Sequence, residues 1–377
     1  MIFWKIPRTM LMALPAETGH NLALTVMHYG EPWVQPRRAM DPILRTEFLG
    51  QSLAHPLGLA AGFDKNGRAF GTVLRMGAQA VELGSVTPLP QPGNLRPRLF
   101  RLTTDRAIIN RMGFNNRGAA ALEPILAAWR RAPRAQGLVG LSLASNSISR
   151  NPIDDFVGLA AQFAPLVDYL TFDISCPNSA NGKIFLQPAA LQQLLAAINQ
   201  VFAADAGLPR PPLLAKLSPD LSDELLADLI GIISAAGIDG LILSNSTTAR
   251  PADLQSRWQG ELGGLSGRPL FAASTAQLAA AYAEIKRLPP RDRPLSLVGV
   301  GGVSTGREAM LKILAGASFV QIYTAMVYRG PCVFRLVARE LAAELKQHGY
   351  GSVAEAVGQG IPKLARKSLS LGGADAN

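Results

Sequence analysis

Eight short runs of apolar residues alternate with helical patterns along most of the chain, and this repeat limits the possible folds more than any other feature of the sequence. The runs predicted as strands are Leu57–Phe63, Ala80–Thr87, Leu138–Leu143, Tyr169–Ser175, Leu213–Ser218, Gly240–Asn245, Ser296–Gly302 and Phe319–Met326. The helices between them are expected near Arg68–Met76, Gly118–Arg131, Asp155–Leu166, Ala189–Ala204, Asp223–Ala236, Ser274–Arg287, Arg307–Ala315 and Cys332–Gln347. Because the strand runs are apolar on both faces, they suit a parallel sheet covered by helices. Eight consecutive βα units close naturally, so the sequence predicts an α/β fold of the (β/α)8 TIM-barrel type rather than a doubly wound open sheet.

Shorter segments flank the predicted barrel, which occupies residues 46–350. Residues 1–45 combine two short amphipathic helical patterns with a linker rich in proline and arginine. Helices of this kind, bearing Trp, Phe and basic residues, can lie in the lipid headgroup region without spanning a bilayer, and a helical hairpin that only caps the barrel is the alternative. No stretch reaches the ~18 uninterrupted apolar residues of a spanning helix. Residues 351–377 are expected to form a polar, loosely attached tail.

The net charge of the chain and its few cysteines limit which ligands and macromolecules it can bind. The chain has 37 Lys and Arg against 27 Asp and Glu, a net charge of +10 that favours nucleic acid, a membrane surface or an acidic small molecule as partner. Nucleic acid is not expected, because the sequence has no basic recognition helix and no aromatic–basic platform. Cys176 and Cys332 are too few for a four-thiolate zinc site, and the four histidines lack ligand spacing, so no metal site is predicted.

Polar and charged residues gather where the predicted strands end, which is where barrels of this type carry their reactive groups. The candidates at these ends and in the long connections 88–115 and 246–271 are Lys65, Ser85, Asn110, Arg111, Asp173, Cys176, Asn178, Lys216, Asn245 and Ser246. Connections of that length are usually lids or binding insertions. Lys216 follows an apolar run and is expected to point into the barrel mouth. Cys176 is a candidate reactive thiol rather than a small buried hydrophobe. The set suggests a small, planar, anionic, amide-like ligand.

A glycine-rich segment, Gly299–Gly302, ends the seventh predicted strand. Loops after strands seven and eight of such barrels often bind phosphate through backbone N–H groups and a helix N-terminus. Gly301 and Gly302 allow the backbone to approach a ligand closely, and Ser304 or Thr305 is placed to begin the next helix. The segment therefore predicts a phosphate site, with tight packing as the alternative explanation.

Seven motifs stand in a characteristic order between Leu14 and Leu345: AAGFDKNG, GSVTPLPQPGNLRPRLFRL, INRMGFNN, KLSPDLS, GGLSGRPL, VGVGGV and GASFVQIYTA. Together they resemble dihydroorotate dehydrogenase, the flavin enzyme of pyrimidine synthesis. The combination of PQPGN and PRLFR with INRMGFNN resembles the quinone-dependent, membrane-associated class, which also has a two-helix N-terminal extension. The resemblance implies oxidation of dihydroorotate to orotate, transfer of the electrons to a membrane quinone, and a peripheral position on the cytoplasmic face of a bacterial membrane.

The same resemblance implies a cofactor and a set of site residues. It implies a bound FMN held by Ala61, Gly62, Lys65, Ser85, Ser142, Asp173, Lys216, Ser244, Gly267, Gly302, Tyr323 and Thr324, with the phosphate near the last three. It implies a substrate that meets Lys65, Asn110, Arg111, Met112, Gly113, Phe114, Asp173, Asn178, Asn245 and Ser246. In this assignment Cys176 is the base for the ring C5 proton while hydride passes to flavin N5. Lys65 suits the substrate carboxylate, and Lys216 would offset negative charge on the reduced flavin.

Three departures from the family pattern lie near the expected pyrimidine rather than the phosphate. Cys176 stands where the quinone class has serine, although the soluble class has cysteine. Asp173 stands where the family has asparagine; it cannot donate an N–H, and its charge would repel an anionic ligand unless paired or protonated. Ser142 and Ala144 replace an asparagine and a glycine of strand three.

These departures keep other hypotheses open. The first is a related FMN oxidoreductase acting on a different dihydropyrimidine or cyclic amide. The second is a phosphate-binding barrel lyase or isomerase with Lys216 as a Schiff-base nucleophile. The third is a membrane-associated flavin-binding protein without catalytic activity.

Overall fold

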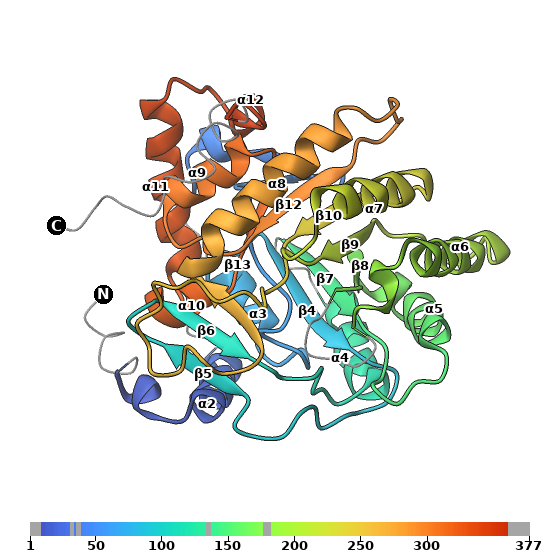
Figure 1. The fold of residues 1–377 in the computed structure, drawn as a ribbon, viewed down its shortest axis with the longest axis horizontal. Helices are drawn as coiled ribbons and strands as arrows, with labels where there is room; N and C mark the ends of the chain where they lie inside the picture. The colour runs from blue at the N-terminus through green and yellow to red at the C-terminus, as the bar shows by residue number, and fades with distance from the viewer. Residues whose placement is uncertain (1–8, 31–33, 35–38, 133–136, 176–181, 361–377) are drawn as a thin grey trace.

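The computed structural model describes residues 9–30, 34, 39–132, 137–175 and 182–360. Within them eight parallel strands close into a barrel in chain order, which confirms the predicted (β/α)8 architecture (Figure 1). The barrel strands are β3 (Leu57–Leu59), β4 (Ala80–Val86), β7 (Leu138–Leu143), β8 (Tyr169–Asp173), β9 (Leu213–Leu217), β10 (Gly240–Leu243), β12 (Ser296–Val300) and β13 (Phe319–Ile322). Almost every strand residue is buried, as expected for a parallel sheet covered on its outer face.

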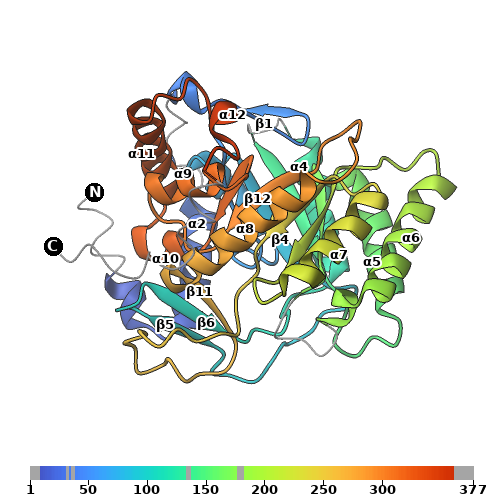
Figure 2. The ribbon, with the colours of Figure 1, turned by 45° about the horizontal axis from the view of Figure 1, so that its top comes forward.

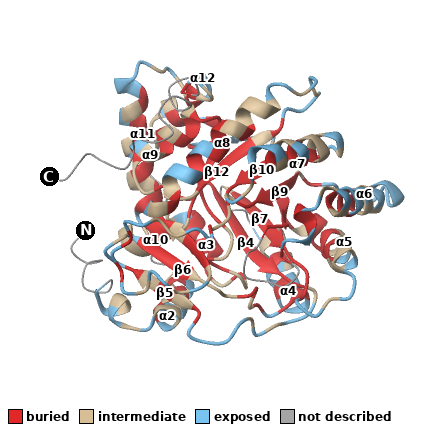
Figure 3. Cartoon of the chain, viewed as in Figure 1, coloured by how far each residue is buried: buried red, intermediate tan, exposed pale blue. Residues whose placement is uncertain are grey.

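Helices surround the barrel, with exposed residues on their outer faces and buried residues against the strands (Figures 2 and 3). They are α3 (Phe70–Arg75), α4 (Ala119–Arg131), α5 (Pro152–Phe163), α6 (Pro188–Ala204), α7 (Asp223–Ala235), α8 (Phe271–Ile285), α9 (Gly306–Leu314), α10 (Thr324–Arg329) and α11 (Val333–Gln347). Several predicted strands run past the observed ends, and the longest overrun without a change of element is Leu57–Phe63, whose strand ends at Leu59. One further prediction is wrong about the type of element. The run Phe319–Met326 was expected to be a single strand, but the chain turns at Tyr323 and its last three residues begin α10. A short apolar run does not by itself distinguish a strand from a helix.

A small β-hairpin closes one end of the barrel. It consists of β1 (Thr46–Phe48) and β2 (Gln51–Leu53), paired antiparallel. The Phe48 ring stacks on Phe319 with centroids 4.3 Å apart and meets Tyr169 edge-on at 6.1 Å. Since Tyr169 and Phe319 begin their strands, the hairpin plugs the N-terminal end of the barrel. The carboxyl ends of the strands are left for a site.

The two long connections pair with each other, which the sequence did not indicate. Strands β5 (Leu99–Leu102) and β6 (Ala107–Asn110) come from the first connection, and β11 (Gly264–Gly267) comes from the second. They form a three-stranded antiparallel sheet in the order β11-β6-β5. This sheet stands beside the carboxyl ends of the barrel strands (Figure 1).

The N-terminal segment is helical over residues 9–13 and again in α2 (Ala16–Gly30). Helix α2 packs against α3 and β5, and Thr72 Oγ1 donates to the Met27 carbonyl at 2.8 Å. No helix in the described part of the chain has both the length and the hydropathy needed to cross a bilayer. Residues 1–8 of the first predicted helix, and residues 31–33 and 35–38 of the predicted linker, lie outside the described residues.

Packed structure continues past residue 350, where the tail was expected to begin. A short helix, α12 (Val353–Ala356), buries Val353 and Ala356. The Gly358 and Gly360 N–H groups each donate at 3.0 Å to carbonyls at the end of α9. These apolar contacts and hydrogen bonds attach the segment to the barrel as far as residue 360. Residues 361–377 lie outside the described residues.

Candidate active site

A cavity of about 780 Å³ lies at the carboxyl ends of the barrel strands, between the barrel and the three-stranded sheet. Most of the predicted site residues line it: Ala61, Gly62, Lys65, Ser85, Asn110, Met112, Gly113, Phe114, Asp173, Lys216, Ser244, Asn245, Ser246, Gly267, Gly302, Tyr323 and Thr324. They come together because parallel strands of a barrel all end on the same face.

Four of the predicted residues are not among those lining the cavity. Ser142 is fully buried below it, with its Oγ 2.8 Å from the Ser85 Oγ. The Arg111 side chain points to the second connection instead, where Nη1 lies 2.7 Å from Glu261 Oε2 and the guanidinium stacks over Phe100. The structure therefore does not bring the Arg111 guanidinium to the predicted substrate. Cys176 and Asn178 lie outside the described residues.

Asp173 and Lys216 form the polar floor of the cavity. They are neighbours in register on β8 and β9, and both are buried, at 8% and 5% exposure. Burial raises the pKa of Asp173, while the charge of Lys216 and a hydrogen bond from Ser85 oppose the rise. The Asp173 carboxylate accepts from Asn245 Nδ2 at 3.1 Å and from Ser85 Oγ at 3.2 Å. Two lining side chains are thereby oriented by one carboxylate.

A second carboxyl group, Glu82, lies beneath this floor and was not among the predicted site residues. It is fully buried on β4, and its Oε2 accepts from Gln321 Nε2 at 3.0 Å and from Thr171 Oγ1 at 3.2 Å. Burial raises the pKa of Glu82, and the charge of Lys216 opposes this. A glutamate inside the otherwise apolar run Ala80–Val86 was the available signal, since an acidic residue is seldom buried without a partner.

Glycines form the other end of the cavity. Gly302 has φ +77°, and a Cβ there would lie 2.5 Å from the Cβ of Phe271. Gly267 has φ +93°, and a Cβ there would lie 2.4 Å from the Arg106 carbonyl oxygen. Both positions need glycine, for space and for backbone conformation. At both positions the protein itself fills the space of a Cβ, so the glycines are explained by tight packing, which was the alternative explanation, and the phosphate site stays a prediction.

Helix α9 begins beside these glycines. Thr305 is its N-cap and forms a capping box with Glu308, which confirms that Thr305 begins the helix. The Glu308 Oε2 atom also accepts from the Ser304 N–H at 2.6 Å and the Thr305 N–H at 2.8 Å. Because the helix satisfies these donors itself, an anion bound at this end would meet the Gly302 and Thr324 segments instead.

The cavity mouth carries arginines that the sequence did not single out. Arg106 and Arg268 are both exposed and line the cavity beside the glycine end. They lie 162 positions apart in the chain and are joined by a 3.3 Å bond from the Arg268 N–H to the Arg106 carbonyl. Val300, Gly301, Ser304 and Thr305 of the predicted phosphate segment and its helix start also line the cavity. The remaining lining residues, which were not predicted, are Ala60, Thr103, Ser266, Leu270, Val303, Glu308, Gln321, Ala325, Tyr328 and Arg329. The arginine pair makes the mouth favourable for an anionic ligand.

Comparison with known proteins agrees with this geometry. Residues 43–345 match the family described as dihydroorotate dehydrogenase. The chain is 43% identical over 358 residues to the dihydroorotate dehydrogenase (quinone) of Rhodospirillum rubrum, covering 94% of each protein. It is 41% identical to the mitochondrial dihydroorotate dehydrogenase (quinone) of Mus musculus, covering 92% of this chain and 87% of that protein.

A solved structure gives the same result at the level of the fold. The crystal structure of the ligand-free DHODH from Eimeria tenella superposes with a TM-score of 0.84 at 35% sequence identity. The match covers 91% of this chain and 99% of that one. The barrel, its site and these similarities lead to one conclusion: the chain belongs to the dihydroorotate dehydrogenase family.

Proposed function

We propose that this protein oxidises dihydroorotate to orotate and passes the electrons to a membrane quinone, a reaction of pyrimidine synthesis, with FMN as its cofactor. The relatives that match over nearly the whole chain carry the name dihydroorotate dehydrogenase (quinone). The observation that carries the proposal is a cavity with two chemically different ends. Gly267 and Gly302 line one end, and the buried Asp173 and Lys216 line the other.

The cavity residues fit FMN. A volume of about 780 Å³ is in the range of cofactor pockets, and Gly302 lines this cavity without a side chain that would cover its backbone. Gly302, Tyr323 and Thr324 would hold the phosphate, and Ser85, Lys216 and Ser244 would lie along the ring system. When bound, FMN supplies the acceptor for the substrate hydride. The chain itself supplies orientation, charge and exclusion of water.

Substrate recognition would use the opposite end of the cavity. Dihydroorotate carries a carboxylate, which suits Lys65, and ring amides, which suit Asn110 and Asn245. Cys176 would take the C5 proton on its Sγ, because a thiol has a pKa of ~8.5 before tuning and is an easier base than a hydroxyl. Cys176 directly follows the buried Ser175, whose Oγ donates to the Lys216 carbonyl at 2.8 Å. That bond anchors the segment leading to the proposed base.

Asp173 makes substrate binding sensitive to charge. Its buried carboxylate already accepts hydrogen bonds from Asn245 and Ser85, and it faces the same cavity as an anionic substrate. If Lys216 or a bound proton neutralises the Asp173 carboxylate, the carboxylate no longer repels the anionic substrate. The same carboxylate would favour a neutral cyclic amide that offers an N–H, which makes such a dihydropyrimidine the second candidate substrate.

Membrane and quinone contact would use the N-terminal helices. Met10, Leu22, Val26 and Tyr29 are exposed there, at 67%, 44%, 60% and 70%. Leu24 and Met27 on the opposite face of α2 are buried in the core. A helix with one apolar face packed and another exposed supports peripheral attachment to a membrane, with quinone reaching the flavin between the helices and the barrel. The cytoplasmic face of that membrane is what the family resemblance implies.

The test begins with the purified protein. It should be yellow and release FMN on denaturation. Mixed with dihydroorotate in the absence of oxygen, it should lose its visible flavin absorbance and form orotate. If a flavin-loaded sample keeps its absorbance at high dihydroorotate, the proposal is wrong, and other dihydropyrimidines become the substrates to screen. A colourless protein whose Lys216 is trapped by borohydride with a carbonyl substrate would support a Schiff-base lyase instead.

A further inference from the structure

We propose that Glu17 and Arg98 are positioning residues that couple the N-terminal helices to the wall of the catalytic cavity. The inference rests on the proposed function, because it assigns the wall over residues 111–114 to substrate binding. Glu17 stands in the first turn of α2, and Arg98 stands in the long connection just before β5. The two residues are 81 positions apart in the chain.

Arg98 is held on two sides, by the Glu17 carboxylate and by the carbonyls of Pro92 and Asn94. Its side chain is only 6% exposed. It donates two hydrogen bonds to the Glu17 carboxylate, from Nη2 at 2.7 Å and from Nε at 3.2 Å. Its Nη1 atom donates to the carbonyls of Pro92 at 2.5 Å and Asn94 at 2.8 Å. A bidentate pair of this kind fixes the orientation of the guanidinium relative to the carboxylate as well as their distance. Loss of Glu17 would leave a buried cation without its counter-ion.

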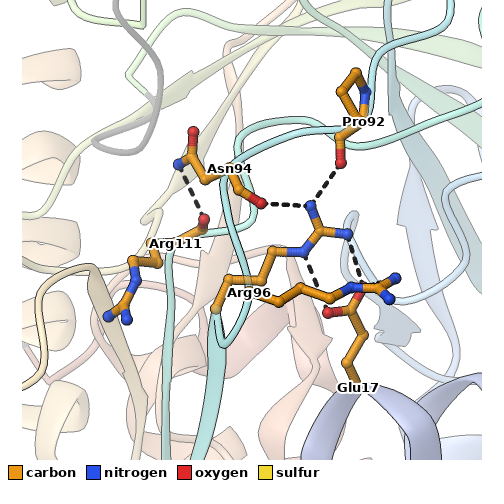
Figure 4. Close-up of polar contacts among 6 residues, drawn as sticks. Glu17, Pro92, Asn94, Arg96 and Arg111 are labelled. Carbon is orange, nitrogen blue, oxygen red and sulfur yellow. Dashed lines mark hydrogen bonds and ion pairs between the residues drawn. The ribbon is translucent and has the colours of Figure 1, made fainter.

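Asn94 extends this network to the cavity wall. Its Nδ2 donates to the Arg111 carbonyl at 2.9 Å (Figure 4). Its N–H donates to the Met112 carbonyl at 3.1 Å. Gly113 has φ +68°, and a Cβ there would lie 2.7 Å from the Asn94 Oδ1. Met112, Gly113 and Phe114 line the cavity. The backbone of this wall is therefore built against the segment that Arg98 holds.

Helix α2 supplies the other end of the coupling. The helix that carries Glu17 also presents Leu22, Val26 and Tyr29 to solvent, on the surface proposed to meet lipid. A shift of α2 on membrane binding would move the Glu17 carboxylate, and Arg98 would transmit that shift to Asn94. The chain of contacts is continuous from the helix to the cavity, so a shift of the helix has a physical route to the cavity wall.

Arg96 provides a matched control. It binds the same Glu17 oxygen at 3.1 Å, but its side chain is 70% exposed, whereas the Arg98 side chain is buried against Pro92 and Asn94. An exposed pair of this kind contributes little to structure. Arg96→Gln therefore removes an equal charge from the same carboxylate without touching the path to the cavity.

The experiment measures the reductive half-reaction of FMN-loaded full-length enzyme in anaerobic stopped flow, with dihydroorotate and no quinone. Glu17→Gln is expected to raise the dissociation constant for dihydroorotate about threefold to tenfold, in the range by which contacts along such networks change coupling. Arg96→Gln is expected to stay within about twofold of wild type. FMN content and melting temperature are recorded for every variant, because a purely structural role of Glu17 would lower the melting temperature and leave the dissociation constant unchanged.

Arg98→Lys is the second variant, in case Glu17→Gln does not fold. It keeps the buried positive charge and loses the planar fork, and it is expected to raise the same dissociation constant. Suppose that dihydroorotate bleaches the flavin of wild type, and that Glu17→Gln or Arg98→Lys has the same dissociation constant for dihydroorotate as Arg96→Gln. The coupling is then refuted and the proposed function stands. If wild type itself is not bleached, the proposed function fails first.

Discussion

Gly302→Ala is the substitution that tests the glycine end of the cavity most sharply. The residue has φ +77°, and its new Cβ would lie 2.5 Å from the Phe271 Cβ and 2.7 Å from the Phe271 Cα. Contacts this close to the backbone of α8 cannot be relieved by rotating a side chain. The loop between β12 and α9 must move, and with it the backbone proposed to hold the FMN phosphate.

The expected cost follows from two contributions. A left-handed backbone conformation costs a residue with a Cβ about 1–2 kcal/mol. Overpacking at a filled position costs about 1–3 kcal/mol more. The sum is roughly 2–5 kcal/mol, and each 1.4 kcal/mol is a factor of ten. If this cost falls on the FMN-binding arrangement of the loop, affinity for FMN should fall by about 30-fold to several thousandfold.

The assay is titration of the apoprotein with FMN, followed by quenching of flavin fluorescence. Gly158→Ala is the matched control, because a Cβ there meets nothing within 4 Å on α5. Helix propensity predicts that this control gains about 0.5–1 kcal/mol of stability and keeps its FMN affinity. Riboflavin, which lacks the phosphate, should lose less affinity than FMN for Gly302→Ala. If Gly302→Ala binds FMN within threefold of Gly158→Ala, the phosphate assignment is wrong.

Three further predictions address the base, the floor of the cavity and the N-terminal helices. Cys176→Ala should keep FMN bound and slow flavin reduction about a hundredfold or more, the usual contribution of a positioned base, and reduction at the wild-type rate would reject the assignment. Because burial raises the pKa of Asp173, the cost of ionising it is absent at low pH and grows as pH rises through the raised pKa. Asp173→Asn should therefore melt at a higher temperature than wild type at high pH. In wild type the dissociation constant for dihydroorotate should rise with pH as Asp173 ionises, and in Asp173→Asn this rise should be smaller. Parallel pH profiles of the two proteins would contradict this. Removal of residues 1–29 should abolish vesicle binding and quinone turnover while dihydroorotate still reduces the flavin, with the weaker binding that loss of Glu17 predicts. Unchanged quinone turnover would refute the role of these helices.

The barrel was predictable from the sequence because its signal is local and repeated. Each βα unit is recognisable in the sequence as an apolar run followed by an amphipathic pattern, and eight such units in a row predict a closed barrel. The same logic placed Asp173 and Lys216 at one cavity, since the ends of parallel strands share a face. Ser304 and Thr305 were the two candidate starts of the helix, and the structure selects Thr305, since a Thr followed three residues later by Glu forms a local capping box.

The features that escaped prediction depend on residues far apart in the chain. Pairing of β6 with β11 joins residues more than 150 positions apart and leaves no periodic trace in either segment. Arg106 and Arg268 meet at the cavity mouth only because of that pairing. Arg111 was assigned to substrate from its motif, but the partner that turns it away, Glu261, lies in the other connection. The Glu17–Arg98 pair escaped for the same reason.

The central claim is tested most directly by full turnover of the wild-type enzyme. FMN-loaded protein in detergent or lipid vesicles is supplied with dihydroorotate and a soluble ubiquinone analogue without oxygen, and orotate and quinol are measured together. We predict one orotate formed for each quinone reduced, with both lost when either dihydroorotate or the quinone is withheld. A flavin-loaded enzyme that forms no orotate, or that forms it without reducing the quinone, would contradict the account.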